Sequence, residues 1–157
     1  DMPWHLDIIG SLGRDAEASR ALQAQIAGAG LQERILLDGE MGEAELAAAY
    51  DRADVFVSPS LYEGYGMALG EAMARGLPIV TTTGGAAGET VPAAAGLKVP
   101  PGDVLALRRA LGRVLADRQL RTRLGEGSWA FGQQLPSWHD TTARIADVLQ
   151  KAAARQS

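Results

Sequence analysis

Two glutamates, Glu63 and Glu71, lie eight positions apart on either side of a Gly-Tyr-Gly turn and the start of an apolar helix. A carboxylate accepts hydrogen bonds well from neighbouring hydroxyl groups. The backbone N–H groups at a helix N-terminus favour an anion, and phosphate above all. Two carboxylates beside such a site do not suit a wholly anionic ligand, so we expect phosphate in the middle of the ligand and hydroxyl groups at both ends. A sugar joined through a diphosphate to a nucleoside has this layout.

The elements that must position this segment alternate along the chain. Short runs rich in β-branched and aromatic residues predict strands at 4–10, 34–39, 53–60 and 77–83, with a short strand and turn at 96–103. Apolar residues at helical spacing predict helices at 15–29, 43–52, 67–75, 104–116 and 118–126, and from 138 to the C-terminus. This alternation indicates an α/β fold with a mainly parallel sheet of about five or six strands, covered by helices on both faces.

The loops at one edge of this sheet are rich in glycine. Ligands of parallel sheets bind outside the carboxyl ends of the strands. The loops expected there are residues 10–14, 39–42, 58–66 and 83–88, and they contain many of the glycines. Glycine lets a ligand approach the backbone closely, so this edge is the predicted binding site.

The composition disfavours several other classes of protein. The net charge is −4 and there is no basic stripe, so we expect no nucleic-acid partner. Cysteine is absent, which excludes a disulfide scaffold and a thiolate metal site. No apolar run approaches the ~18 residues of a membrane span, and no signal peptide is apparent, so we expect a cytoplasmic location. The first strand is followed by "GSLGRD" rather than G-x-G-x-x-G, which disfavours a dinucleotide-binding domain.

The segment "PSLYEGYGMALGEAMARGLPIV" resembles the donor-site signature of retaining glycosyltransferases with the GT-B fold, in the glycogen-synthase-like and mannosyltransferase-like group. Further segments resemble the family in register: "RILLDGEM", "ELAAAYDRADVFVSPS", "GGAAGETV", "GLKVPPGD" and "LPSWHDTTARIADVL". The resemblance covers nearly the whole chain. It implies that residues 1–157 form a Rossmann-like three-layer α/β/α sandwich, the C-terminal, nucleotide-sugar-binding half of a GT-B enzyme that transfers a hexosyl group with retention at the anomeric carbon.

The resemblance also implies roles for single residues. Glu63 would be the catalytic residue, orienting the donor sugar near the reacting carbon and stabilising positive charge there. Glu71 would bind the ribose hydroxyls, and the backbone N–H groups of Tyr65, Gly66 and Met67 would bind the diphosphate. The remaining donor-site residues are Gly64 in the turn, Met41 beside the nucleobase, and Gly10 and Ser11 at the border of the same pocket.

The chain departs from the family pattern in its basic residues. The family uses an arginine and a lysine to neutralise the diphosphate, but Lys98 and Lys151 lie at no predicted ligand loop and Arg14 is out of pattern. The N-terminal acceptor domain and the first strand–helix unit of the donor domain also have no counterpart in this sequence. We therefore expect a donor domain that does not transfer sugar by itself. Its implied partners are a UDP-, GDP- or ADP-linked sugar and an N-terminal acceptor domain, with any peripheral membrane contact made through that other half.

Two other functions stay open at this point. One is a nucleotide-sugar-binding module without catalysis, and the other is a nucleotide-sugar epimerase on the same half-fold. A phosphorylase would need a lysine bound to pyridoxal phosphate, and neither lysine lies in a fitting motif. The expected mechanism requires no metal or cofactor, because the helix N-terminus and the basic pair supply the positive charge.

Overall fold

The computed structural model describes residues 2–136 and 138–154. The chain divides into two compact units, residues 1–49 and 50–157, which we call the N-terminal and C-terminal units and describe separately. Helix α2 (Glu43–Arg52) crosses the boundary between them.

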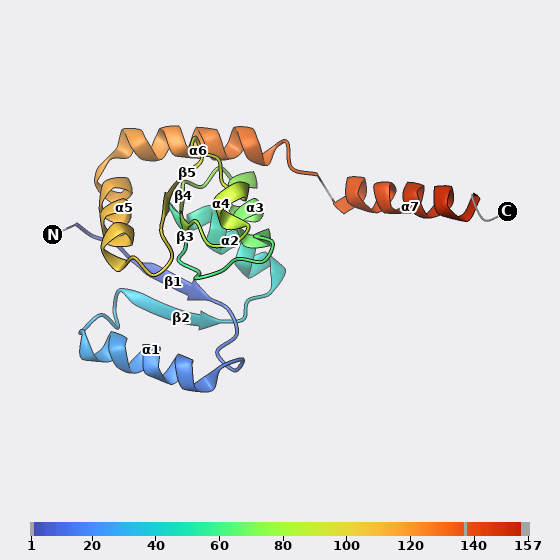
Figure 1. The fold of residues 1–157 in the computed structure, drawn as a ribbon. Coiled ribbons are helices and arrows are strands. Elements are labelled where there is room, and N and C mark those ends of the chain that lie inside the picture. The colour runs from blue at the N-terminus through green and yellow to red at the C-terminus, as the bar shows by residue number, and fades with distance from the viewer. Residues whose placement is uncertain (1, 137, 155–157) are drawn as a thin grey trace. The chain divides into compact units, whose positions relative to one another are not determined.

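The N-terminal unit contains two parallel strands joined by one helix (Figure 1). Strand β1 (Leu6–Ile9) pairs with β2 (Ile35–Gly39), and α1 (Ala16–Gly28) connects them. The Asp15 carboxylate begins α1 by accepting a hydrogen bond from the Ala18 N–H at 2.9 Å. Aspartate is a favoured residue at this position because it satisfies a donor that the helix leaves free.

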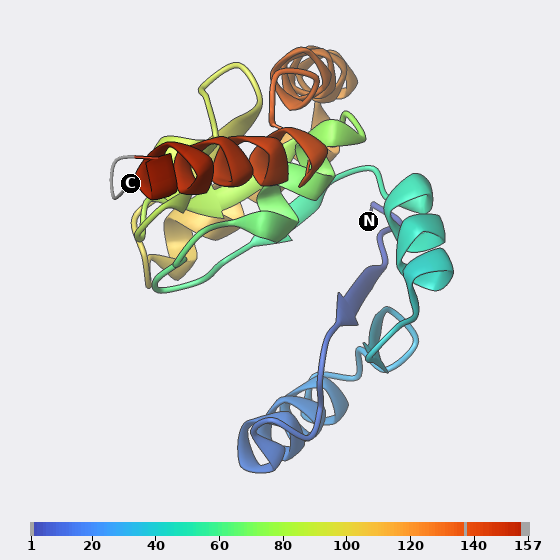
Figure 2. The same ribbon diagram turned by 90° about the vertical axis from the view of Figure 1, so that its right-hand side faces the viewer.

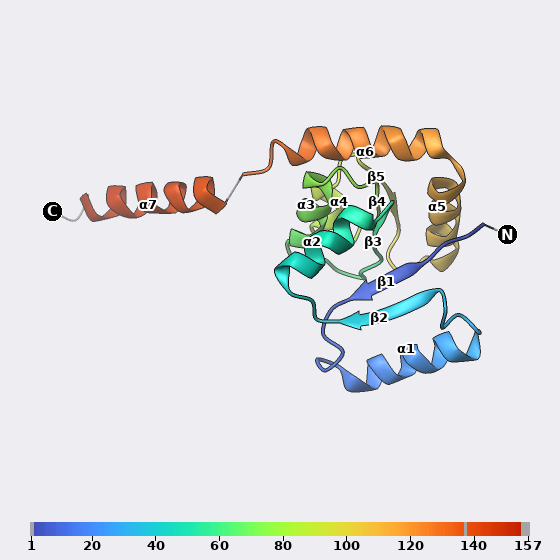
Figure 3. The ribbon, with the colours of Figure 1, turned by 180° about the vertical axis from the view of Figure 1, so that it is seen from behind.

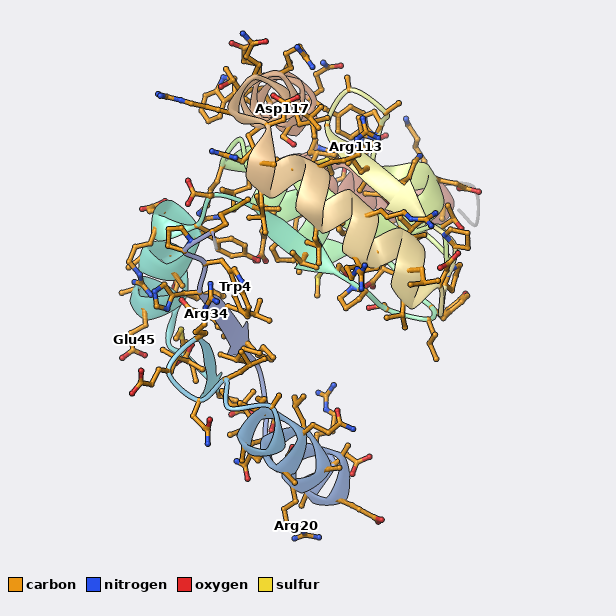
Figure 4. The ribbon with its side chains drawn as sticks, turned by 90° about the vertical axis from the view of Figure 1, so that its left-hand side faces the viewer. Trp4, Arg20, Arg34, Glu45, Arg113 and Asp117 are labelled. Carbon is orange, nitrogen blue, oxygen red and sulfur yellow. The ribbon has the colours of Figure 1, made fainter. Side chains whose placement is uncertain are left out.

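Arg34, just before β2, fixes the segment that precedes β1. Its guanidinium carbon lies 4.0 Å from the centroid of the Trp4 ring, and Figure 4 shows the two side chains together. The same guanidinium donates from Nε to the Trp4 carbonyl at 3.1 Å. Arg34 therefore contacts both the ring and the backbone of Trp4, through a cation–π contact and a hydrogen bond.

The C-terminal unit contains a three-stranded parallel sheet. Its strands are β3 (Phe56–Ser58), β4 (Ile79–Thr82) and β5 (Gly96–Val99), in the order β3-β4-β5. In the register, Phe56 lies opposite Ile79, which in turn lies opposite Gly96. Every residue of the central strand is buried, as expected for a parallel strand that is covered on both faces.

Helices pack against both faces of this sheet. The described helices of the unit are α3 (Met67–Ala74), α4 (Ala87–Thr90), α5 (Val104–Ala116), α6 (Arg118–Gly132) and α7 (Trp138–Ala154). Helix α5 lies on one side of the strands, and α3 and α4 lie on the other (Figures 1 and 3). Helix α6 runs crosswise to α5 (Figures 1 and 2), and the labelled residues Arg113 and Asp117 mark the corner between them in Figure 4.

The core of the unit is formed by apolar side chains from both layers. One buried cluster joins β4 and β5 to α5 and α6 and consists of Val80, Val99, Ala110, Val114 and Leu124. Leu69 and Met73 of α3 are also buried. Burial of one such valine or leucine side chain contributes about 1.5–3 kcal/mol, so this packing stabilises β4 and β5 against α5 and α6.

Helix α6 is longer than the sequence predicts. The expected helix ends at residue 126, whereas α6 continues to Gly132. A Cβ atom at Gly127 would collide with the Ala94 carbonyl oxygen, and one at Gly132 would collide with the Met73 carbonyl oxygen. These glycines therefore permit close packing against neighbouring backbone rather than ending the helix.

The α/β class and the parallel pairing are confirmed, but the arrangement of the strands differs from the prediction of one continuous sheet. The described strands form two ladders, β1-β2 and β3-β4-β5, each within one unit. The strand predicted at 53–60 shortens to Phe56–Ser58 and ends before Pro59, which has no N–H to donate to a ladder. Helix α4 was not predicted, because four residues are too few to show a helical period.

The C-terminal helix begins at Trp138, as predicted, and its predicted continuation over residues 155–157 lies outside the described residues. Within residues 2–136 and 138–154, no helix combines the length and apolarity that crossing a membrane requires.

Candidate functional site

The loops that follow β3 and β4 leave the sheet at the same edge, because the two strands are adjacent and parallel. Glu63 in the first loop lies beside Gly85 in the second as an isolated parallel bridge. The Glu63 N–H donates to the Gly84 carbonyl at 3.1 Å, and the Glu63 carbonyl accepts from the Ala86 N–H at 2.8 Å. Glu63 is therefore held at the carboxyl edge of the sheet, where the sequence places it.

Two buried threonines at the end of β4 fix the start of the Glu63 loop. Thr81 Oγ1 donates to the Ser58 carbonyl at 3.0 Å, and Thr82 Oγ1 donates to the Ser60 carbonyl at 2.6 Å. Gly85 next to them has φ +64°, and a side chain there would collide with the Glu63 carbonyl. We did not predict these supports from the sequence, and the only available signal was the polar pair at the end of an apolar strand.

The Glu63 side chain turns back onto the start of α3. Its Oε1 accepts hydrogen bonds from the Tyr65 N–H at 3.3 Å and from the Gly66 N–H at 3.0 Å. Gly66 has φ +84°, a left-handed conformation that permits the sharp entry into α3. Two of the three N–H groups predicted to face a diphosphate are thus bonded to Glu63.

The first turn of α3 presents further donors. Helix geometry leaves the N–H groups of Met67, Ala68 and Leu69 without intrahelical partners, and the helix dipole makes this end positive. The α3 N-cap residue, Gly66, offers no side chain that could cap them. The side chains of Tyr65 and Met67 are exposed. The segment predicted as an anion site is a helix start without a side-chain cap, and the Tyr65 and Gly66 N–H groups beside it are bonded to Glu63.

Glu71 lies on the exposed side of α3 and is bonded to a tyrosine of α2. The Tyr50 hydroxyl donates to Glu71 Oε2 at 3.1 Å. Burial, followed by the charge of Glu71 and this hydrogen bond, raises the pKa of Tyr50 to about 12, and Arg75 opposes the shift. Tyr50 thus remains a hydrogen-bond donor at neutral pH. The sequence showed Tyr50 only as one residue on the apolar side of its helix, because nothing in the spacing reveals a contact between residues 50 and 71.

The other predicted donor-site residues belong to the N-terminal unit. Gly10 and Ser11 follow β1 and are exposed, and Met41 follows β2 and is half-buried. The Gly10 N–H donates to the Gly39 carbonyl at 2.8 Å. The structure thus brings the loops of these three residues to one edge of the β1-β2 ladder. Glu63, Gly64, Tyr65, Gly66, Met67 and Glu71 form their own group in the C-terminal unit.

Both lysines are bonded to residues near them in the structure. Lys98 Nζ donates to the carbonyls of Gly88 at 2.8 Å and Val91 at 2.9 Å, and Lys151 pairs with Asp147 on α7 at 2.6 Å. Lys98 thus stabilises the segment around Gly88 and Val91, and Lys151 stabilises α7. In the part of the chain that the structure describes, no three acidic or histidine side chains gather as metal ligands.

Comparison with known proteins decides the family. The family model for glycosyl transferases group 1 matches residues 1–117. This chain belongs to that family. The resemblance seen in the glutamate–glycine signature is thereby confirmed, and so is the Rossmann-like fold.

Similar proteins and solved structures agree with this assignment. The MMP alpha-(1->4)-mannosyltransferase of Mycolicibacterium hassiacum is 38% identical over 133 residues, which are 83% of this chain and 32% of the relative. Sucrose-phosphate synthase from Thermosynechococcus elongatus superimposes with a TM-score of 0.86 at 30% identity, over 96% of this chain and 39% of that one. HepE of Anabaena, solved in complex with UDP, has a TM-score of 0.83 at 23% identity, over 94% and 41%. The chain spans about a third of the length of the curated relatives that it matches.

Proposed function

We propose that residues 1–157 form the donor-binding domain of a retaining glycosyltransferase and that they bind a nucleoside-diphosphate sugar. The observation that carries the proposal is the position of Glu63 and Glu71 around the N-terminus of α3, at the carboxyl edge of a parallel sheet. An anion site between two carboxylates fits a diphosphate between two hydroxyl-bearing groups. The family assignment supports this reading, since its members are glycosyl transferases.

The proposal gives each carboxylate its own part of the ligand. Glu71 accepts hydrogen bonds from the ribose hydroxyls, and the N–H groups of Met67 and Ala68 receive the diphosphate. Glu63 exchanges its bonds to Tyr65 and Gly66 for the donor sugar, which frees those two N–H groups for phosphate oxygens. Donors aimed at the leaving group stabilise the charge that develops on it during transfer.

The identity of the nucleotide is a further part of the proposal. HepE has been solved with UDP and with UDP-glucose, which makes UDP the first probe, with GDP and ADP as the alternatives. Gly10, Ser11 and Met41 of the N-terminal unit remain proposed donor-site residues. We propose that no metal is needed, because the N–H groups at the start of α3 supply positive charge to the diphosphate.

Transfer itself needs an acceptor, which we propose is held by an N-terminal domain of the same protein. Positioning two reactants supplies much of the rate of such a reaction. The chain by itself should therefore bind the donor and show no acceptor-dependent transfer. Binding without transfer, even with that domain present, would instead favour a module that has lost its catalysis.

A thermal-unfolding screen tests the proposal. A ligand that binds only the folded chain raises its unfolding temperature, so UDP, GDP or ADP should do so at millimolar concentration, and uridine, guanosine or adenosine much less. The shift should be lost in Glu71→Ala and kept in Glu126→Ala, an exposed glutamate on α6. No shift with any of the three diphosphates would contradict the proposal.

A further inference from the structure

Tyr50 bonds to Glu71 from a protected position. The Tyr50 residue is 8% exposed, whereas Glu71 is exposed, and their side chains are joined by the hydrogen bond at 3.1 Å. Two contacts fix the tyrosine ring: the Phe56 ring centroid is 6.0 Å away, and the Arg75 guanidinium carbon is 4.8 Å from the Tyr50 ring centroid. A buried hydroxyl donor therefore bonds to the carboxylate of an exposed side chain.

The hydroxyl of Tyr50 donates to Glu71 Oε2, so this bond occupies one acceptor site on one of the two carboxylate oxygens. A carboxylate has about four acceptor sites on its two oxygens. The bond thus restricts the rotation of the carboxylate while leaving acceptor sites for a pair of neighbouring hydroxyl groups.

We propose that Tyr50 is a positioning residue that orients Glu71 for a vicinal diol and thereby makes the site selective for ribonucleotides over deoxyribonucleotides. This inference rests on the proposed function, in which Glu71 meets the ribose. A ligand without the 2′- and 3′-hydroxyl groups gains nothing from an oriented carboxylate. A ribonucleotide gains, because the freedom that Glu71 would otherwise lose on binding is already restricted.

The competing explanation is that the bond only ties α2 to α3. In that case its loss would lower the stability of the fold and weaken every nucleotide equally. The two explanations therefore differ in the ratio of affinities for a ribonucleotide and its dideoxy form. They also differ in whether Tyr50 still matters once Glu71 is gone.

The test is calorimetric binding of UDP, GDP and ADP and of their 2′,3′-dideoxy forms to the chain and its variants. Tyr50→Phe removes the hydroxyl and keeps the ring contacts. It should weaken the tightest ribonucleoside diphosphate by roughly three- to tenfold and leave its dideoxy form within about twofold. In a Glu71→Ala background the same substitution should have no further effect, because coupled residues are not additive. Glu126→Ala, an exposed glutamate on α6, is the control and should change neither affinity.

Three results would overturn the inference. If Glu71→Ala weakens the ribonucleotide but Tyr50→Phe does not, Tyr50 has no positioning role while the proposed function stands. If Tyr50→Phe weakens both nucleotide forms equally, the bond is only structural. If Glu71→Ala has no effect, or none of the three diphosphates binds, the proposed function fails and the inference fails with it.

Discussion

The Glu63 carboxylate accepts a hydrogen bond from the Gly66 N–H at 3.0 Å, at the entry to the helix that bears Glu71. The predicted anion site therefore already holds a negative charge that belongs to the protein. A glutamate with this bond has two uses: it satisfies the start of α3, and it can be exchanged for a ligand. The two uses can be separated by measuring stability and binding on the same variants.

Removing the Glu63 carboxylate should destabilise the chain modestly. Glu63→Ala leaves the N–H groups of Tyr65 and Gly66 to water, and we expect a loss of about 1 kcal/mol in the free energy of unfolding, the usual cost of losing a side-chain cap. Denaturant titration measures it. Glu126→Ala should stay within about 0.5 kcal/mol of wild type, because exposed sites without special contacts change stability little. Equal losses in both variants would show that the Glu63 bonds contribute nothing to stability.

The two glycines of the Gly-Tyr-Gly turn should respond differently to alanine. Gly66 has φ +84°, and a Cβ there would lie 3.1 Å from Leu69 Cδ1, so Gly66→Ala should cost about 1–3 kcal/mol of unfolding free energy. A Cβ at Gly64 would meet nothing within 4 Å, and its φ is not positive. Gly64→Ala should therefore be tolerated. Denaturant titration of the pair measures the difference, and equal costs would contradict the left-handed entry to α3.

The stability of the chain should depend on pH through Tyr50. Its pKa rises from 10.0 in the unfolded chain to about 12 in the folded one, so the folded state favours the protonated phenol. The resulting stabilisation is fully present below pH 10 and is lost as the pH rises from 10 to about 12. The difference in unfolding free energy between wild type and Tyr50→Phe should shrink over that range. A difference that is constant through the range would mean that Tyr50 has an unshifted pKa.

Gly127 on α6 and Gly112 on α5 allow a direct test of whether α6 packs closely against the backbone. Gly127→Ala on α6 would drive a methyl group into the Ala94 carbonyl, and we expect a loss of about 1–3 kcal/mol from the overpacked interface. Gly112→Ala on α5 meets nothing within 4 Å and should stabilise the chain by about 0.5–1 kcal/mol, because alanine is the better helix former. Thermal unfolding of both variants tests the signs, and stabilisation by Gly127→Ala would refute the close packing of α6.

Much of the fold could be predicted from local patterns. The helices over Glu43–Arg52 and Val104–Ala116 have the predicted bounds, because their apolar spacing is clear and capping or turn residues flank them. The end of α6 was wrong because glycine in a sequence signals flexibility, whereas here it makes room for another backbone segment. That distinction depends on which segment packs there, and no local pattern contains it.

For the candidate site too, some features could be predicted from the sequence and others could not. The positions of Glu63 and Glu71 at a strand end and on a helix followed from the order of elements along the chain. The bond from Tyr50 to Glu71 and the return of Glu63 onto Gly66 did not. The first joins residues 21 positions apart, and the second depends on one rotamer of one side chain. Both are tertiary details that the spacing of residues leaves open.

The division of labour between the two glutamates is the central claim, and calorimetric titration with UDP and UDP-glucose, with the GDP and ADP counterparts in parallel, tests it most directly. Glu71→Ala should weaken the plain diphosphate by about 10- to 100-fold, the loss of one or two hydrogen bonds to a charged group. Glu63→Ala should not weaken the plain diphosphate, but it should weaken the sugar conjugate by about tenfold. Equal losses of plain diphosphate affinity in the two variants would contradict the account.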